Sequence, residues 1–168
     1  MKVYRTDEIR NVVLLGHGGS GKTSLVEAML YVSGATNRMG KIADHNTTSD
    51  FDKEEQKREF SISTSLIPIE WEKAKINVLD TPGYFDFVGE VEEAVSAADA
   101  AVIVVSGKAG VEVGTEKAWE LFKELEAKGG FVEAIKAGLV QDAIAEIAAK
   151  RAKDVAMRKT TILGTNQY

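Results

Sequence analysis

One octapeptide sets the architecture expected of this chain, namely Gly16-His17-Gly18-Gly19-Ser20-Gly21-Lys22-Thr23. It matches the P-loop pattern, GxxxxGK followed by Ser or Thr. The apolar run 11–15 before it predicts a buried strand, and the apolar spacing over 22–32 predicts a helix. An ordinary glycine-rich turn is the alternative, but this strand-and-helix context favours the P-loop.

The P-loop indicates a nucleoside phosphate as ligand. Backbone N–H groups of such a loop surround phosphate oxygens, and the helix N-terminus adds a positive dipole end. Lys22 would reach the β- and γ-phosphates, and the Thr23 hydroxyl would ligate Mg²⁺. His17 is expected to fill a variable position with its side chain directed away. The expected nucleotide-binding residues are Gly16, Gly18, Gly19, Ser20, Gly21, Lys22, Thr23 and Ser24.

A second element with phosphate chemistry is Asp80-Thr81-Pro82-Gly83, which closes the predicted strand 76–80. Taken alone, this tetrapeptide is typical of a turn. Downstream of a P-loop, however, the Asp80 carboxylate can hold Mg²⁺ through water. The Gly83 N–H can bond a γ-phosphate and report its loss.

The remaining pattern predicts an α/β protein with a three-layer, P-loop NTPase-like fold. Its sheet is mostly parallel with one antiparallel edge hairpin, because Pro68 confines its strand to an edge. The polar stretch 34–60 has no period and is expected to be functional or disordered, and the charge run 53–59 to be solvated. The other predicted elements are strands over 61–71, 76–80 and 100–105, a helix after Gly83, and helices over 113–127 and 139–157.

Composition excludes several classes of protein. The 168 residues contain no cysteine, which removes disulfides, zinc fingers and thiol nucleophiles, and only two histidines. The net charge of −5 argues against a general nucleic-acid binder. No signal peptide is visible, and the longest apolar run, 100–105, is too short to cross a membrane. We therefore expect a cytoplasmic protein that binds neither membranes nor nucleic acid directly.

Residues 9–123 resemble the front half of the GTPase domain of elongation factor G and its tetracycline-resistance-type relatives. The likeness rests on GHGGSGKTSL, EEQKREFSIST and DTPGYFDFVGEVEEAVSAADAAVIVVSGKAGV, in that order. It implies GTP or GDP as the ligand and Mg²⁺ as the cofactor. It also implies that the polar stretch ending at Phe60 is the first switch, and that residues 80–87 begin the second.

Two departures from the family motifs bear on catalysis, for which the resemblance implies Lys22, Gly83 and residue 84. Aligning the family's RGITI with REFSI puts Ser61 at the threonine that closes over Mg²⁺, and a serine supplies the same hydroxyl. The family's DTPGH reads DTPGY here, so Tyr84 occupies the water-orienting position. Because a phenol neither accepts protons readily at neutral pH nor positions water as an imidazole does, slow or absent hydrolysis is expected.

The C-terminal quarter departs further, since the family's guanine-reading NKxD motif is missing. Residues 125–168 instead resemble a stretch of methylmalonyl-CoA mutase, with its GG…ILGTNxY pattern, and carry over no mutase activity. Their composition also shifts, with seven Lys/Arg and five Asp/Glu in 126–168. Two families joined near residue 125 indicate an artificial chimera. We expect one P-loop domain over 1–168, in which the 125–168 helix-helix-strand part completes the sheet of 1–124. Asn166 would then lie near the base-reading position, or in a frayed end.

Three functional interpretations follow from these features. The first is Mg²⁺-dependent binding of GTP and GDP with slow or absent hydrolysis. The second is an engineered scaffold that binds no nucleotide, and the third is a base-indifferent phosphate binder. Ribosome binding is not expected of these residues, while an exposed edge around Pro68 could form a homodimer.

Overall fold

The computed structural model describes residues 2–127, 145, 149–150, 153 and 155–157. The chain divides into two compact units, Met1–Glu124 and Leu125–Tyr168. In the second unit, residues 145, 149–150, 153 and 155–156 are helical, within the predicted helix 139–157. The predicted last strand and Asn166 lie outside the described residues, so completion of the sheet by this unit stays a prediction.

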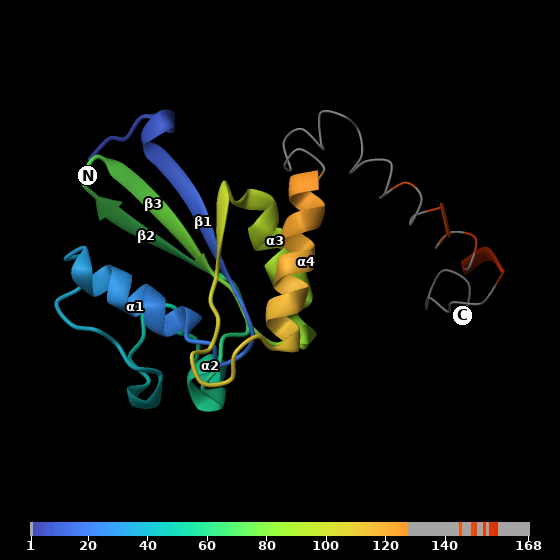
Figure 1. Cartoon of the computed structure of the whole chain (residues 1–168), viewed down its shortest axis with the longest axis horizontal. Helices are drawn as coiled ribbons and strands as arrows, with labels where there is room; N and C mark the ends of the chain where they lie inside the picture. The colour runs from blue at the N-terminus through green and yellow to red at the C-terminus, as the bar shows by residue number, and fades with distance from the viewer. Residues whose placement is uncertain (1, 128–144, 146–148, 151–152, 154, 158–168) are drawn as a thin grey trace. The chain divides into compact units, whose positions relative to one another are not determined.

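The first unit contains a four-stranded sheet in the order β2-β3-β1-β4 (Figure 1). β1 (Ile9–Leu15) lies in the interior and pairs in parallel with both β3 (Ala74–Asp80) and β4 (Ala100–Ile103). β2 (Ser65–Trp71) pairs antiparallel with β3, and within the described sheet it has a neighbour on that side only. Pro68 therefore lies on an edge strand, and the predicted fold class is confirmed.

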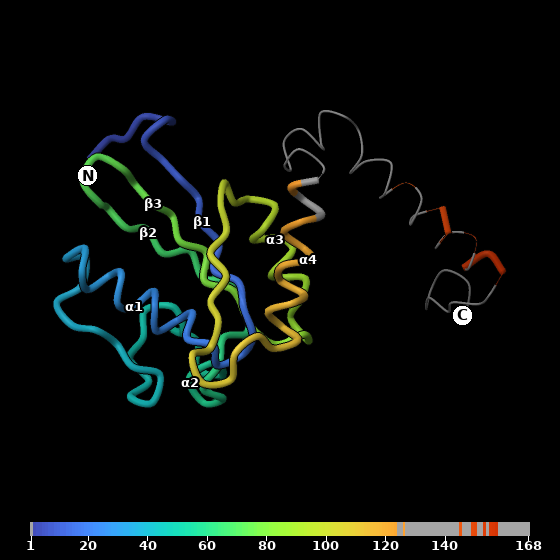
Figure 2. The backbone as a smooth tube through the Cα atoms, in the orientation of Figure 1, coloured from blue at the N-terminus to red at the C-terminus, as the bar shows by residue number. Residues whose placement is uncertain are grey.

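Helices cover the two faces of this sheet. Figure 1 shows α1 (Lys22–Val32) on one side, and α3 (Val88–Ala97) and α4 (Val113–Ala127) on the other. The backbone trace in Figure 2 follows the chain from β1 through the P-loop into α1. The remaining helical elements are α2 (Lys53–Arg58) and three short 3₁₀ turns, η1 (Thr6–Glu8), η2 (Ile42–Asp44) and η3 (Phe85–Phe87).

The core explains why the P-loop is held firmly at both ends. Leu14, at the end of β1, packs with Val26 and Leu30 of α1 and with side chains of the hairpin. Fully burying a side chain of this kind stabilises the fold by about 1.5–3 kcal/mol. The strand before the loop and the helix after it are thus fixed by the same cluster.

Two predicted strands are longer than the observed ones. The strand predicted over 61–71 begins at Ser65, because the N–H groups of residues 62–64 donate to the carboxylates of Glu55 and Glu90 instead of a strand. The strand predicted over 100–105 ends at Ile103, since its partner β1 ends at Leu15 where the P-loop begins. The polar stretch 34–60 also contains α2, which the sequence pattern did not predict.

Candidate phosphate-binding site

The P-loop leaves β1 at Gly16 and enters α1 at Lys22. Gly21 caps α1 with φ +101°, in the left-handed region that glycine tolerates best. No Cβ fits at Gly16, where it would collide with the backbone oxygen of Val104. The glycines at these two positions therefore let the backbone turn sharply and lie against the end of β4.

Lys22 is buried within this loop. Its Nζ donates to the carbonyl oxygens of Gly16 at 2.9 Å and His17 at 3.1 Å. Burial lowers the pKa of Lys22, and the negative charge of Asp80 opposes that effect. The ammonium group is thus held at the centre of the loop by two backbone contacts.

The segment Asp80–Tyr84 lies directly against the P-loop. Thr81 Oγ1 donates to the carbonyl of Leu14 at 2.6 Å, which ties this segment to the end of β1. A Cβ placed on Gly83 would lie 2.5 Å from the Gly18 nitrogen and 2.6 Å from Lys22 Nζ. Residue 83 must therefore be glycine for the two segments to approach so closely.

Tyr84 covers the loop from outside. A Cβ on Gly18 would lie 2.9 Å from the Tyr84 ring, so the absence of a side chain at 18 makes room for the phenol. The Tyr84 ring also contacts Phe60, with 4.7 Å between the ring centroids. Tyr84 is nevertheless 44% exposed, which keeps one side of its ring open to solvent.

The three predicted Mg²⁺ ligands come together at one place. Thr23 Oγ1 donates to Asp80 Oδ2 at 2.9 Å and lies 3.4 Å from Ser61 Oγ. Ser61 Oγ in turn donates to Asp50 Oδ1 at 2.7 Å. The structure thus adds Asp50 to the residues that the sequence indicated.

Both carboxyl groups at this place are buried, and their protons are bound more tightly as a result. Burial raises the pKa of Asp80 to about 6, although the Thr23 hydrogen bond lowers it. Burial also raises the pKa of Asp50, and the hydrogen bond from Ser61 opposes that effect. Both carboxyl groups therefore hold their protons more tightly than exposed carboxyls do, and the nearby Lys22 ammonium offsets part of that effect for Asp80.

Sequence reasoning missed three buried acidic residues: Glu27, Asp50 and Glu55. Glu27 accepts from the N–H groups of Gly40 and Thr48, which fastens this part of the polar stretch 34–60 to α1. Glu55 belongs to the charge run expected to be solvated, and that expectation was wrong for this residue. The signal for Glu27 was present, because this carboxylate lies on the same helical face as Thr23 and Leu30.

Most of the predicted site residues line a cavity of about 60 Å³. The predicted residues that line it are Gly18, Gly19, Gly21, Lys22, Thr23, Ser61, Gly83 and Tyr84. Gly16, Ser20, Ser24 and Asp80 do not line it, and Ser24 is exposed on α1. Ser20 Oγ is buried and has no hydrogen-bond partner among the described residues.

The described residues contain no group of three or more His, Cys, Asp or Glu arranged to hold a metal ion. The site above combines two carboxylates with hydroxyl groups instead. In the same part of the chain, no helix combines the length and apolar character that a membrane span requires.

A mostly parallel sheet with a P-loop after its first strand and a carboxylate at the end of β3 defines a P-loop nucleotide-binding domain. Within that class, the family described as "Elongation factor Tu GTP binding domain" matches residues 7–162. The chain therefore belongs to this family, and the expected likeness to elongation factor G is confirmed.

Individual relatives agree with this assignment. The chain is 42% identical over 111 residues to mitochondrial ribosome-releasing factor 2 of Anopheles gambiae, covering 66% of this chain and 15% of that protein. It is 36% identical over 121 residues to elongation factor G of Granulibacter bethesdensis, covering 72% of this chain and 18% of that protein. A crystal structure of a protein from Thermus thermophilus is similar, with a TM-score of 0.68 and 46% identity, covering 70% of this chain and 18% of that one. The chain thus spans less than a fifth of these relatives.

Proposed function

We propose that this chain binds GTP and GDP together with Mg²⁺ at the loop between β1 and α1. The observation that carries the proposal is the convergence of three separate segments on one cavity: the P-loop, residues 50–61 and residues 81–84. Folding brings Lys22, Ser61 and Gly83 together there, and each is a residue for which the sequence predicts contact with a phosphate or its cation.

The P-loop supplies the phosphate contacts in this proposal. Its N–H groups and the N-terminus of α1 favour an anion, and Lys22 adds a positive charge. Because Lys22 Nζ already lies 2.9 Å from the Gly16 oxygen, little reordering of its side chain is needed when phosphate arrives. Gly83, which lies against the same loop, would donate its N–H to a γ-phosphate.

The residues of this site fit Mg²⁺, a hard cation that takes oxygen ligands. Asp80 Oδ2 accepts from the Thr23 hydroxyl at 2.9 Å, so its carboxylate lies directly behind the predicted Thr23 ligand, where it would hold a water of the hydrated ion. Thr23 and Ser61 would hold the ion through their hydroxyls, and Asp80 through water. When bound, Mg²⁺ neutralises charge on the β- and γ-phosphates. Its positive charge would also offset the cost of burying the carboxylates of Asp50 and Asp80.

Guanine is the base we propose, because the chain belongs to a family described as GTP-binding. The chain lacks the NKxD motif, and Asn166, the residue proposed in its place, lies outside the described residues. Selectivity for GTP over ATP is measured directly by the ratio of their Kd values.

Hydrolysis is proposed to be slow or absent. Tyr84 stands at the water-orienting position, and its ring lies on Gly18 and against Phe60. A neutral phenol there has no imidazole nitrogen with which to orient an attacking water. Phosphate release from the isolated chain should stay below one turnover per minute, and multiple turnovers per minute would contradict the proposal.

Calorimetric titration with GDP, GTP and ATP, with and without Mg²⁺, tests the binding proposal against its alternatives. Heat with GDP and GTP that depends on Mg²⁺ and exceeds that with ATP supports it. Equal affinity for GTP, ATP and pyrophosphate would favour the base-indifferent phosphate binder. No heat from a folded protein would favour a scaffold that keeps the motif without its function.

The proposal also covers partners and location. The relative from Anopheles gambiae is named for ribosome release, but this chain spans 15% of it. We propose that these 168 residues form no stable ribosome complex by themselves, which a pelleting assay tests. A cytoplasmic location is proposed as well, to be checked by fractionation. Pairing of two copies along the β2 edge, where Leu66 and Trp71 are exposed, is tested by sedimentation at rising concentration.

The chimeric origin of the tail remains a proposal. The compact units divide between Glu124 and Leu125, and the alignments with relatives cover 66% to 72% of the chain, which supports a junction near 125. The family match, in contrast, extends to residue 162. Sequencing the source gene across the codon for residue 125 decides between a chimeric and a natural origin of the tail.

A further inference from the structure

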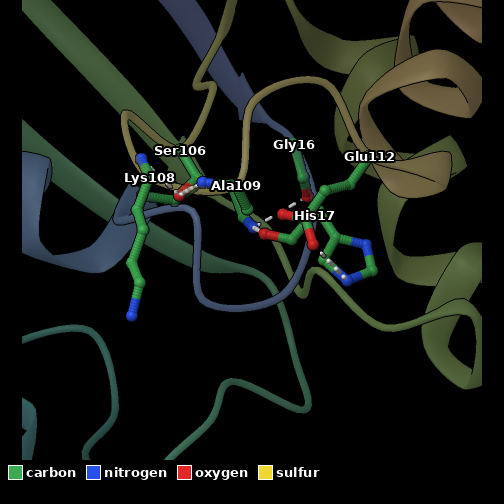
Figure 3. A network of polar contacts seen from close by, with 7 residues as sticks. Gly16, His17, Ser106, Lys108, Ala109 and Glu112 are labelled. Atoms are coloured by element: carbon green, nitrogen blue, oxygen red, sulfur yellow. Dashed lines mark hydrogen bonds and ion pairs between the residues drawn. The ribbon is translucent and has the colours of Figure 1, made fainter.

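The side chain of His17 takes no part in the phosphate-binding cavity. It leaves the P-loop on the side of the segment that leads into α4, as Figure 3 shows. The imidazole Nε2 lies 3.6 Å from Glu112 Oε1, an ionic contact when His17 is protonated. The ring also meets Phe85 edge-on, with 6.5 Å between centroids.

The first turn of α4 fits tightly around this ring. A Cβ on Gly114 would lie 2.6 Å from His17 Nδ1 and 2.9 Å from its Cα. His17 Nδ1 is buried and has no hydrogen-bond partner among the described residues. The glycine at 114 therefore provides the space in which the imidazole is seated.

The partners of the ring are themselves well fixed. The carbonyl of Glu112 accepts from the N–H groups of Thr115 at 2.8 Å and Glu116 at 3.1 Å, which begins α4 at this point. Because α4 spans Val113–Ala127, Gly114 lies in its first turn and Glu112 directly precedes it. His17 thus connects the P-loop to a fixed element.

The backbone of His17 faces the phosphate site. Its carbonyl oxygen accepts from Lys22 Nζ at 3.1 Å and from the Ser20 N–H at 3.1 Å. A shift of residue 17 would therefore move one of the two carbonyls that hold the Lys22 ammonium. Side chain and backbone of this residue join α4 to the centre of the P-loop.

We propose that His17 is a positioning residue of the phosphate site. Its imidazole packs against Glu112 and Gly114 and thereby holds the P-loop in place. The proposal rests on the nucleotide binding proposed above. It assigns no contact between His17 and the nucleotide. The effect passes through the His17 carbonyl to Lys22, and through the turn that ends at Ser20.

Two independent substitutions test this. His17→Ala removes the ring, and Gly114→Ala displaces it by its Cβ while adding a better helix former, worth about 1 kcal/mol of helix propensity. His17→Gln keeps an N–H donor near Glu112. Lys73→Ala, at an exposed lysine in the β2–β3 turn, serves as the control.

The readouts are the Kd of GDP with Mg²⁺ and, separately, the thermal midpoint of the nucleotide-free protein. We expect His17→Ala and Gly114→Ala each to raise the Kd about tenfold, His17→Gln to stay within about threefold, and Lys73→Ala to match wild type. The loss of affinity should persist at temperatures below the thermal midpoint, where each variant is folded. A purely structural role would lower the midpoint and leave the Kd of the folded protein unchanged.

The outcomes separate the two proposals. If wild type binds GDP and both His17→Ala and Gly114→Ala bind equally well, the role of His17 is overturned and the proposed function stands. If affinity falls only where the protein unfolds, the role is likewise overturned. If folded wild type binds no GDP, GTP or pyrophosphate, the proposed function falls and this inference falls with it.

Discussion

Replacing Asp80 by Asn should stabilise the nucleotide-free protein and impair its ligand binding. Asp80 is 1% exposed, and it accepts a hydrogen bond from Thr23 Oγ1 at 2.9 Å. Its pKa is about 6 in the fold and 3.8 ordinarily, a difference that corresponds to about 3 kcal/mol. A carboxylate buried there therefore destabilises the fold at neutral pH, although the nearby Lys22 ammonium offsets part of the cost.

The sign of the pH dependence follows from that raised pKa. Since the folded protein binds the Asp80 proton more tightly than the unfolded chain, the resulting stability is complete below pH 3.8 and is lost as pH rises through about 6. Between pH 5 and pH 8 the free energy of unfolding of the wild type should fall by about 1.4 kcal/mol relative to that of Asp80→Asn. At pH 8 the variant should be more stable by about 1–3 kcal/mol, the lower figure allowing for its unpaired amide.

Urea unfolding in EDTA, at several pH values from 5 to 8, measures this difference. Asp44→Asn, at an exposed carboxyl, is the control and should follow the wild type. Adding Mg²⁺ and GDP should stabilise the wild type and leave Asp80→Asn nearly unchanged. A stability difference that stays constant across this pH range, or that favours the wild type increasingly at high pH, would refute the reasoning.

Three further predictions concern the elements that support the site. Leu14→Ala should lower the free energy of unfolding by about 2–5 kcal/mol in urea titrations, because Leu14 is fully buried in the core; a loss below about 1 kcal/mol would contradict this. Thr81→Val should cost about 1–2 kcal/mol by the same assay, because it removes the hydrogen bond to the Leu14 carbonyl, and no loss would count against that bond. Glu55→Ala should speed hydrogen exchange at the Ile62 and Ser63 amides, which donate to its carboxylate, whereas unchanged protection would show other partners.

The parts of the fold with a strong periodic pattern could be predicted from sequence. The run before Gly16 and the apolar spacing after Lys22 predicted β1 and α1, and Pro68 correctly indicated an edge strand. The predicted strand from residue 61 began too early, because N–H groups there bond to the Glu55 carboxylate, a long-range contact with no periodic signature.

The candidate site was predictable where a motif fixes spacing, and less so elsewhere. The sequence predicted that Thr23, Ser61 and Asp80 share one Mg²⁺ site, and in the structure these side chains lie close together. Asp50 was missed because it lies in a polar stretch without period, where only the folded loop shows which carboxylate is buried. The fit of Tyr84 over Gly18 was missed too, because it depends on the approach of two segments.

The measurement that tests the central claim most directly is calorimetric titration of nucleotide-free protein with GDP and Mg²⁺, comparing wild type with Lys22→Ala. Lys73→Ala, at an exposed lysine in the β2–β3 turn, is the matched control. Removing one charge-assisted phosphate contact of about 1.5–3 kcal/mol should weaken binding by at least about tenfold in Lys22→Ala and leave Lys73→Ala unchanged. Equal affinity in Lys22→Ala and wild type would contradict a phosphate site at this loop.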